Sequence, residues 1–157
     1  MGYQSNVRMV IRGPKETILA GFGALALTGD ATMHECLTEW AITEDGVQKT
    51  VGEPDVPLAV AILGKGGTNW KWYDSYSDVI AHEKIFAYFE ELYENYANEH
   101  PYNLLNGAFA RIGEDENDIV SQYWGFDPYD LLSVRRTIDC PYDSEEKPDL
   151  RASLSNA

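Results

Sequence analysis

Apolar and polar residues alternate along several stretches of the chain, which is the pattern of a half-buried strand. Within residues 1–12, Val7, Met9 and Ile11 alternate loosely with more polar neighbours. The same pattern predicts strands over residues 31–48, with a turn at 44–46, and over residues 102–112 and 131–138. The uninterrupted apolar run 58–63 predicts a central strand, and Trp70 and Trp72 predict a short strand with both indoles on one face.

Helical periodicity is strongest after Trp72. Ile85, Phe89, Leu92 and Tyr96 are spaced by four, three and four residues, which places them on one face of a helix over residues 76–98. Ser75 and Asp78 fit the capping box of a helix N-terminus, and Pro101 ends the pattern. We expect this aromatic-rich helix to cover a sheet. Weaker patterns predict a helix from Pro14 to Gly29 and a short helix over residues 119–124, after the acidic turn 113–118.

The order β-α-β-β-α-β, followed by a short helix and a strand, predicts an α+β fold. We expect a ferredoxin-like split βαβ arrangement, which is a two-layer sandwich with a C-terminal helix and strand extension. Another two-layer α+β sandwich with a mixed sheet is the alternative. Residues 1–140 are expected to form a single domain, and residues 141–157 an acidic, weakly ordered tail.

The net negative charge of the chain favours some classes of binding partner over others. The sequence has 12 Lys and Arg against 26 Asp and Glu, so its formal net charge is -14. Direct binding to a nucleic-acid backbone is not expected, because that interaction needs basic side chains. An acidic surface suits solubility, a basic protein partner or the imitation of a nucleic acid. No apolar run reaches the ~20 residues of a membrane span, and no secretory signal is recognised, so we expect a cytoplasmic protein with Cys36 and Cys140 reduced.

The sequence contains no recognised catalytic or metal-binding motif. The acidic turn does not match the EF-hand pattern, and the histidines and cysteines lack the paired spacing of a zinc site. The glycine run 64–67 does not match a P-loop and predicts a hinge or bulge. We therefore expect no cofactor, no metal and no enzymatic activity.

Three motifs resemble a family of small, mostly uncharacterised phage and prophage proteins. They are Met1-Gly2-Tyr3-x-Ser5-x-Val7, Trp72-Tyr73-x-x-Tyr76-x-Asp78-Val79 and Arg111-Ile112-Gly113-Glu114-Asp115-x-x-Asp118-Ile119. The resemblance implies a protein made in an infected bacterial cytoplasm, where many accessory proteins bind and block host factors. It supplies no catalytic residues.

Two functional hypotheses follow. The first is a phage accessory protein that binds and inhibits a host protein, with an anti-phage defence protein or a nucleic-acid-binding protein as candidate targets and DNA mimicry as a variant. Its expected contact residues are acidic: Glu90, Glu91, Glu94, Glu114, Asp115, Glu116 and Asp118. The alternative is a protein that sequesters a nucleotide or cyclic nucleotide through aromatic and arginine side chains: Trp70, Trp72, Tyr73, Arg111, Arg135 and Arg136. The sequence leaves homo-oligomerisation open.

Overall fold

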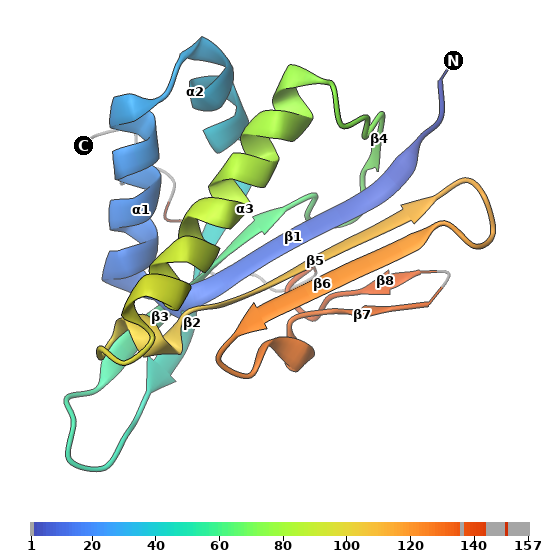
Figure 1. The fold of residues 1–157 in the computed structure, drawn as a ribbon. Coiled ribbons are helices and arrows are strands. Elements are labelled where there is room, and N and C mark those ends of the chain that lie inside the picture. The colour runs from blue at the N-terminus through green and yellow to red at the C-terminus, as the bar shows by residue number, and fades with distance from the viewer. Residues whose placement is uncertain (1, 136, 144–149, 151–157) are drawn as a thin grey trace.

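An antiparallel sheet organises the chain, as shown by a computed structural model that describes residues 2–135, 137–143 and 150 (Figure 1). The strand order is β2-β3-β1-β5-β6, and the short β4 pairs with the start of β1. The strands are β1 (Ser5–Pro14), β2 (Trp40–Gln48), β3 (Val56–Leu63), β4 (Asn69–Trp70), β5 (Asn106–Gly113) and β6 (Ile119–Gly125). The predicted central strand is β3, which lies between β2 and β1.

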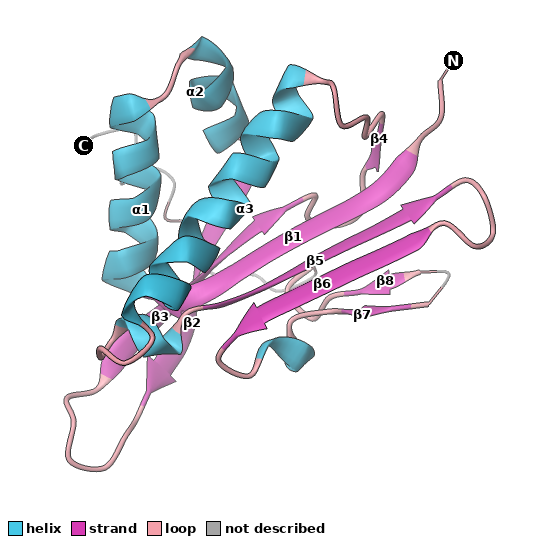
Figure 2. Ribbon diagram, in the orientation of Figure 1, coloured by secondary structure: helices cyan, strands magenta, loops and turns pink. Residues whose placement is uncertain are grey.

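The helices cover one face of this sheet and a small hairpin covers the other (Figure 2). The helices are α1 (Lys15–Thr28), α2 (Ala31–Leu37) and α3 (Ser77–Tyr96), and the hairpin consists of β7 (Ser133–Val134) and β8 (Ile138–Asp139). Two 3-10 turns, η1 (Tyr102–Leu104) and η2 (Pro128–Asp130), precede β5 and β7. The predicted α+β class is confirmed. No helix among the described residues has the length and apolar character needed to cross a membrane.

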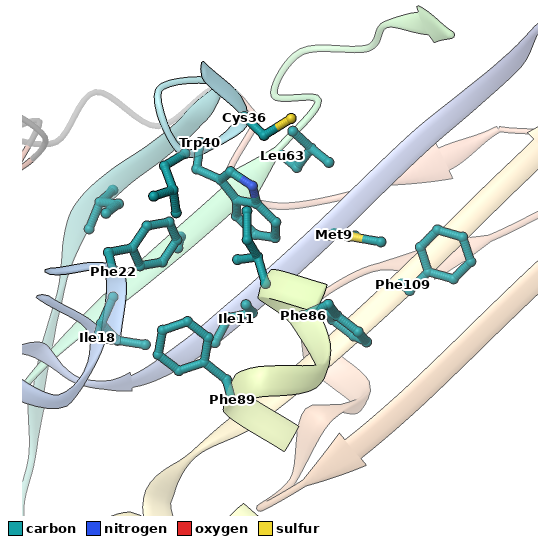
Figure 3. Packing of buried hydrophobic residues seen from close by; sticks show 14 of the residues in the cluster. Met9, Ile11, Ile18, Phe22, Cys36, Trp40, Leu63, Phe86, Phe89 and Phe109 are labelled. Carbon is teal, nitrogen blue, oxygen red and sulfur yellow. The ribbon is translucent and has the colours of Figure 1, made fainter. Parts of the chain in front are cut away.

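The main core lies between the helices and the sheet (Figure 3). Phe22 of α1, Trp40 of β2 and Phe89 of α3 meet there, and the ring centroids of Phe22 lie 5.7 Å from Trp40 and 5.5 Å from Phe89. The alternation of β1 sends Val7, Met9 and Ile11 into this core and Val10 into the second one. α3 packs against the sheet, as its periodicity predicts, and α1 covers the same face beside it; Tyr96 at the end of α3 is exposed.

Two predicted elements are wrong. The strand expected from residue 31 begins only at Trp40, because Ala31–Leu37 forms α2. Asp30 caps this helix by accepting a hydrogen bond from the Met33 N–H at 2.9 Å. The short helix expected over residues 119–124 is strand β6, which pairs along its whole length with β5.

Other predictions need smaller corrections. The predicted capping box of α3 is not formed, because Tyr76 is the N-cap and the Asp78 carboxylate instead accepts from the Trp70 indole N–H at 3.2 Å. Residues 102–104, expected in a strand, form η1, and the strand expected over residues 131–138 is divided between β7 and β8. The predicted turn at Gly46 is a bulge between Glu44 and Val47 of β2.

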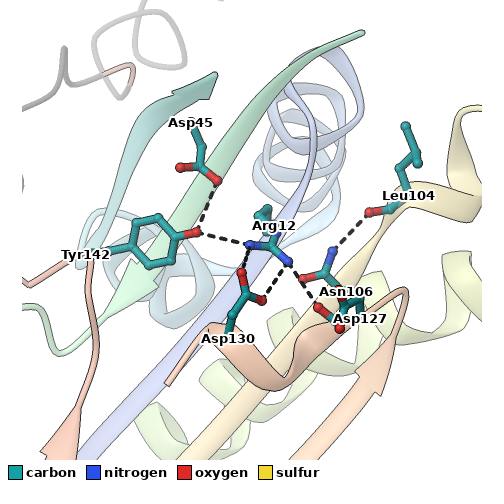
Figure 4. A network of polar contacts seen from close by, with 7 residues as sticks. All are labelled: Arg12, Asp45, Leu104, Asn106, Asp127, Asp130 and Tyr142. Atoms are coloured by element: carbon teal, nitrogen blue, oxygen red, sulfur yellow. Dashed lines mark hydrogen bonds and ion pairs between the residues drawn. The ribbon is translucent and has the colours of Figure 1, made fainter. Parts of the chain in front are cut away.

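The C-terminal extension is attached to the sheet by Arg12 (Figure 4). The Arg12 guanidinium donates to both carboxylate oxygens of Asp130 at 3.0 Å and to the Tyr142 hydroxyl at 3.2 Å. Tyr142 in turn donates to Asp45 at 3.1 Å, and burial raises the pKa of its hydroxyl to about 12. Residues 141–143 of the predicted tail thus pack on the domain, whereas 144–149 and 151–157 lie outside the described residues.

Candidate functional site

The three motifs of the phage-protein resemblance come together around Tyr3. The Tyr3 hydroxyl donates to Asp118 Oδ2 at 2.7 Å, and the Asp115 N–H donates to the same hydroxyl at 2.9 Å. The Tyr3 N–H donates to the Tyr73 hydroxyl at 2.6 Å. The first motif is therefore bonded to both of the others, although 115 positions separate Tyr3 from Asp118.

Arg111 completes this group, which we call the Tyr3 cluster (Tyr3, Tyr73, Arg111 and Asp118). Arg111 Nη1 and Nη2 each donate to one Asp118 oxygen at 2.8 Å, in the bidentate geometry of a strong pair. Hydrogen bonds from Arg111 and then from Tyr3 hold the pKa of the Asp118 carboxyl below its usual range. Gly113 lies directly against Asp118 and Tyr3, where a Cβ atom would collide with both side chains. The cluster thus stabilises the β5–β6 turn.

An aromatic cleft of about 340 Å³ adjoins the Tyr3 cluster, between α3 and strands β5 and β6. Its inner wall is apolar and includes Met9 of β1, Phe109 of β5 and Phe86 of α3. Trp72, Ala87 of α3, and Val120 and Gln122 of β6 also line it. Four charged side chains complete the lining: Asp74, Glu83, Glu90 and Arg111.

The charge of the cleft is negative. Arg111 is already paired with Asp118, while no ion pair among the described residues involves Asp74, Glu83 or Glu90. Partial burial, followed by the charge of Asp74, raises the pKa of Glu83. Partial burial, followed by the charges of Glu94 and Glu91, raises the pKa of Glu90. A cation placed between these carboxylates would relieve both effects, because it stabilises the ionised form.

The predicted acidic contact residues occupy different positions. Glu90 lines the cleft, while Glu91 and Glu94 are exposed on α3 outside its lining. In the β5–β6 turn, Glu114 accepts from the Gln4 N–H at 2.8 Å, and Asp118 is held within the Tyr3 cluster. Asp115 and Glu116 are exposed at the tip of this turn. The structure therefore does not gather the predicted acidic residues into one site.

The residues of the predicted nucleotide pocket are only partly brought together. Trp72 and Arg111 line the cleft, the Trp70 and Trp72 ring centroids are 5.4 Å apart, and Tyr73 belongs to the Tyr3 cluster. Arg135 lies in the β7–β8 turn, in the layer on the opposite face of the sheet. Arg136 lies outside the described residues. The glycine run after β3 directs its Gly66 N–H at the chain's own Asp143 carboxylate, at 3.2 Å.

A second group of potentially reactive side chains surrounds His82, which packs against the indoles of Trp70 and Trp72. Potential ligand atoms of Cys36, Glu39 and His82 lie within 4.8 Å of one another, so we tested whether they fit a metal ion. His82 is fully buried, and its Nδ1 accepts a hydrogen bond from the Trp40 indole N–H at 3.1 Å. An indole N–H can only donate, so the proton of the neutral imidazole lies on Nε2. Nε2 faces Glu39 Oε2 at 3.4 Å and, carrying a proton, does not offer a lone pair to a metal.

These side chains do not form a catalytic pair either. Burial, followed by the charge of Glu39, raises the pKa of the Cys36 thiol to about 11, which keeps it in the unreactive protonated form. Burial lowers the pKa of His82 to about 4. Cys36 and Cys140 are not joined in a disulfide; both are buried, and they belong to the cores on opposite faces of the sheet.

Sequence patterns did not single out Asp74, Glu83, Phe86 and Phe109 as members of a site. One available signal was the seven-residue spacing of Glu83 and Glu90, which places both carboxylates on one side of the helix two turns apart. The contribution of β5 and β6 depends on tertiary packing, which this spacing does not reveal. Comparison of the chain with protein-family models, curated protein sequences and solved structures gave no match.

Proposed function

We propose that the protein binds and inhibits a host bacterial protein, and that the aromatic cleft receives a basic part of this partner. The observation that carries the proposal is one cleft that combines an aromatic wall with Asp74, Glu83 and Glu90, for which the described residues supply no ion-pair partner. Aromatic faces attract cations by roughly 0.5–2 kcal/mol, and carboxylates add a charge-assisted hydrogen bond. A lysine or arginine side chain matches both features.

The same charges weigh against the nucleotide alternative. A phosphate entering the cleft would approach three carboxylates, and the one arginine there already shares its charge with Asp118. Like charges that are brought together without compensation disfavour binding. The predicted pocket also lacks Arg135, which lies on the other side of the sheet.

The biological setting is part of the proposal and depends on the resemblance to phage proteins. In that setting the target is a cytoplasmic host protein, with a defence protein and a nucleic-acid-binding protein as candidates. Competition by duplex DNA for the same target would support the DNA-mimic variant. We also propose that strands β1, β2, β3 and β5 with α1 and α3 form a ferredoxin-like unit, which the order β2-β3-β1-β5 supports.

The test is an affinity capture from bacterial lysate at low and high salt. We expect the wild-type protein to retain one stoichiometric protein at low salt and to lose it at high salt, because exposed charges are screened. The Glu83→Gln/Glu90→Gln variant should lose the partner. A matched control, Glu53→Gln/Glu99→Gln, changes the net charge equally at exposed positions outside the cleft. Equal loss in both variants, or no captured protein, would refute the cleft as the contact site.

A further inference from the structure

Strand β6 is an edge of the sheet that lacks the usual protection against pairing. It has seven residues, and among residues 2–135, 137–143 and 150 it pairs only with β5. It contains no charged residue and no proline between Ile119 and Gly125. Natural edge strands are normally interrupted by charges, prolines or bulges, or are covered by other parts of the chain. The opposite edge, β2, has such features. It carries Glu44 and Asp45 beside a bulge, and Ile42 O accepts a hydrogen bond from the Leu150 N–H at 2.6 Å.

The hydrogen bonds at the two ends of the β5–β6 pair show which backbone groups of β6 face outward. The Gly113 N–H donates to Asp118 O at 2.8 Å, and the Phe126 N–H donates to Leu105 O at 3.0 Å. Hydrogen-bonded pairs alternate along an antiparallel ladder, so Val120 and Gln122 bond to β5. The N–H and C=O groups of Ser121 and Tyr123 therefore point away from β5, and no backbone partner for them is found in the described part of the chain.

The open edge borders the aromatic cleft. Val120 and Gln122 direct their side chains to the helix-covered face and line the cleft. Side chains directly opposite each other on neighbouring antiparallel strands have Cβ atoms about 4.5–5.5 Å apart. A residue opposite Val120 or Gln122 on an added strand would therefore project to the same face, where a long basic side chain can reach toward Glu90 and Glu83.

We propose that β6 binds an extended, basic segment of the partner as an additional β-strand, and that alternate lysine or arginine side chains of this segment enter the aromatic cleft. This inference rests on the proposed function and specifies the form of the partner. Backbone hydrogen bonds to an edge strand supply affinity in this mode of recognition, and alternate side-chain pockets supply specificity. The charge decides against a second copy as the occupant, because each copy carries -14 and repels another.

The binding test uses the full chain and a defined probe. The probe is a nine-residue peptide in which lysine alternates with valine or threonine, and the control peptide has glutamate in place of lysine. We expect the amides of Ser121 and Tyr123 to exchange with solvent about tenfold more slowly when the lysine peptide is present at ten times its Kd. The glutamate peptide should give no protection. Protection confined to cleft residues, with Ser121 and Tyr123 unchanged, overturns the added strand.

The Ser121→Pro variant distinguishes binding along the edge of β6 from binding in the aromatic cleft alone. Because the Ser121 N–H faces outward, Ser121→Pro removes a donor for the added strand while leaving the β5 ladder in place. We expect this variant to lose the lysine peptide. If its circular dichroism shows that it is unfolded, Ser121→Lys replaces it, since an edge lysine repels a basic strand.

The outcomes separate the two proposals. If Glu83→Gln/Glu90→Gln loses the peptide and the folded Ser121 variant retains it, the cleft binds cations and the added strand is refuted. If neither variant affects binding, both proposals fail. A concentration-dependent dimer in sedimentation equilibrium, abolished by the Ser121 variant, would identify a second copy as the occupant and overturn the basic partner strand.

Discussion

The buried imidazole of His82 makes stability depend on pH in a defined window. His82 is fully buried, and burial lowers its pKa from 6.5 to about 4. The Trp40 indole donates to Nδ1, and the Trp70 and Trp72 rings pack against the imidazole. The titratable neighbours are Cys36, Glu39 and Asp78; the charge of Asp78 raises the pKa of His82, but burial lowers it by more. The folded state therefore favours the neutral imidazole more than the unfolded state does.

The sign and size of the effect follow from linkage. Between the two pKa values the unfolded chain binds the proton and the folded protein does not, so stability rises with pH. The contribution of neutral His82 to the free energy of unfolding is fully present above pH 6.5 and is lost as the pH falls toward about 4. A difference of about 2.5 pKa units corresponds to about 3 kcal/mol in full, of which about 2 kcal/mol is lost between about pH 7 and about pH 4.5.

The assay is urea unfolding, followed by tryptophan fluorescence, of the wild type and of His82→Gln. His82→Gln is the control for carboxylates that titrate in the same pH range. Both proteins contain these carboxylates, so the difference between the two losses of stability reports on His82 alone. We expect the wild type to lose about 2 kcal/mol more than His82→Gln between about pH 7 and about pH 4.5. Equal losses within about 0.5 kcal/mol would show that His82 is not held neutral by burial.

Three further predictions concern the core, the thiols and the Tyr3 cluster. Phe89→Ala should lower the free energy of unfolding by about 3–5 kcal/mol, whereas Leu27→Ala, at a side chain that is 90% exposed, should change it by less than about 0.5 kcal/mol in urea unfolding. Cys36 should react with iodoacetamide only on unfolding, since its thiol is buried and has a pKa of about 11; rapid labelling of the native protein, mapped by mass spectrometry, would contradict this. Tyr3→Phe and Asp118→Asn should each lower the melting temperature, and the double variant should lose less than the sum, because both remove the same hydrogen bond. Additive losses in that cycle would argue against the cluster.

The elements that local pattern specifies strongly could be predicted from the sequence. β3 follows from its apolar run, and α3 follows from its aromatic periodicity. α2 was hidden because Cys36, Trp40 and Ile42 also satisfy a strand alternation, although Asp30 followed by Met33, Cys36 and Leu37 carries a helix cap and helical spacing. β6 was mistaken for a helix because acidic residues precede it, which is also the pattern of a helix N-terminus. Pairing with β5 decides the outcome, and that is a tertiary effect.

The candidate site was less predictable than the fold because its residues come from distant segments. Glu90, Trp72 and Arg111 were each expected to contact a ligand or partner, but under two competing hypotheses. The sequence does not reveal that they share one cleft, nor that Asp118 is bonded to Arg111 and to Tyr3 at the same time. Asp118 is predicted from the sequence to be a partner-contact residue, whereas its carboxylate accepts hydrogen bonds from Arg111 and Tyr3.

Arg111 links the Tyr3 cluster to the function proposed for the cleft. Its guanidinium lines the cleft, but it donates two hydrogen bonds to Asp118, whose negative charge offsets that of Arg111. Without that pair, the cleft would hold a free arginine beside Asp74, whose charge already acts on Arg111, and the positive charge would offset part of the acidic lining. Under the proposed function, Asp118 therefore favours a basic partner without touching it. The proposed function thus predicts that a residue of the β5–β6 turn affects binding although the turn lies outside the cleft lining. The pair of Asp118 with Arg111 keeps the cleft beside the open edge of β6 negative.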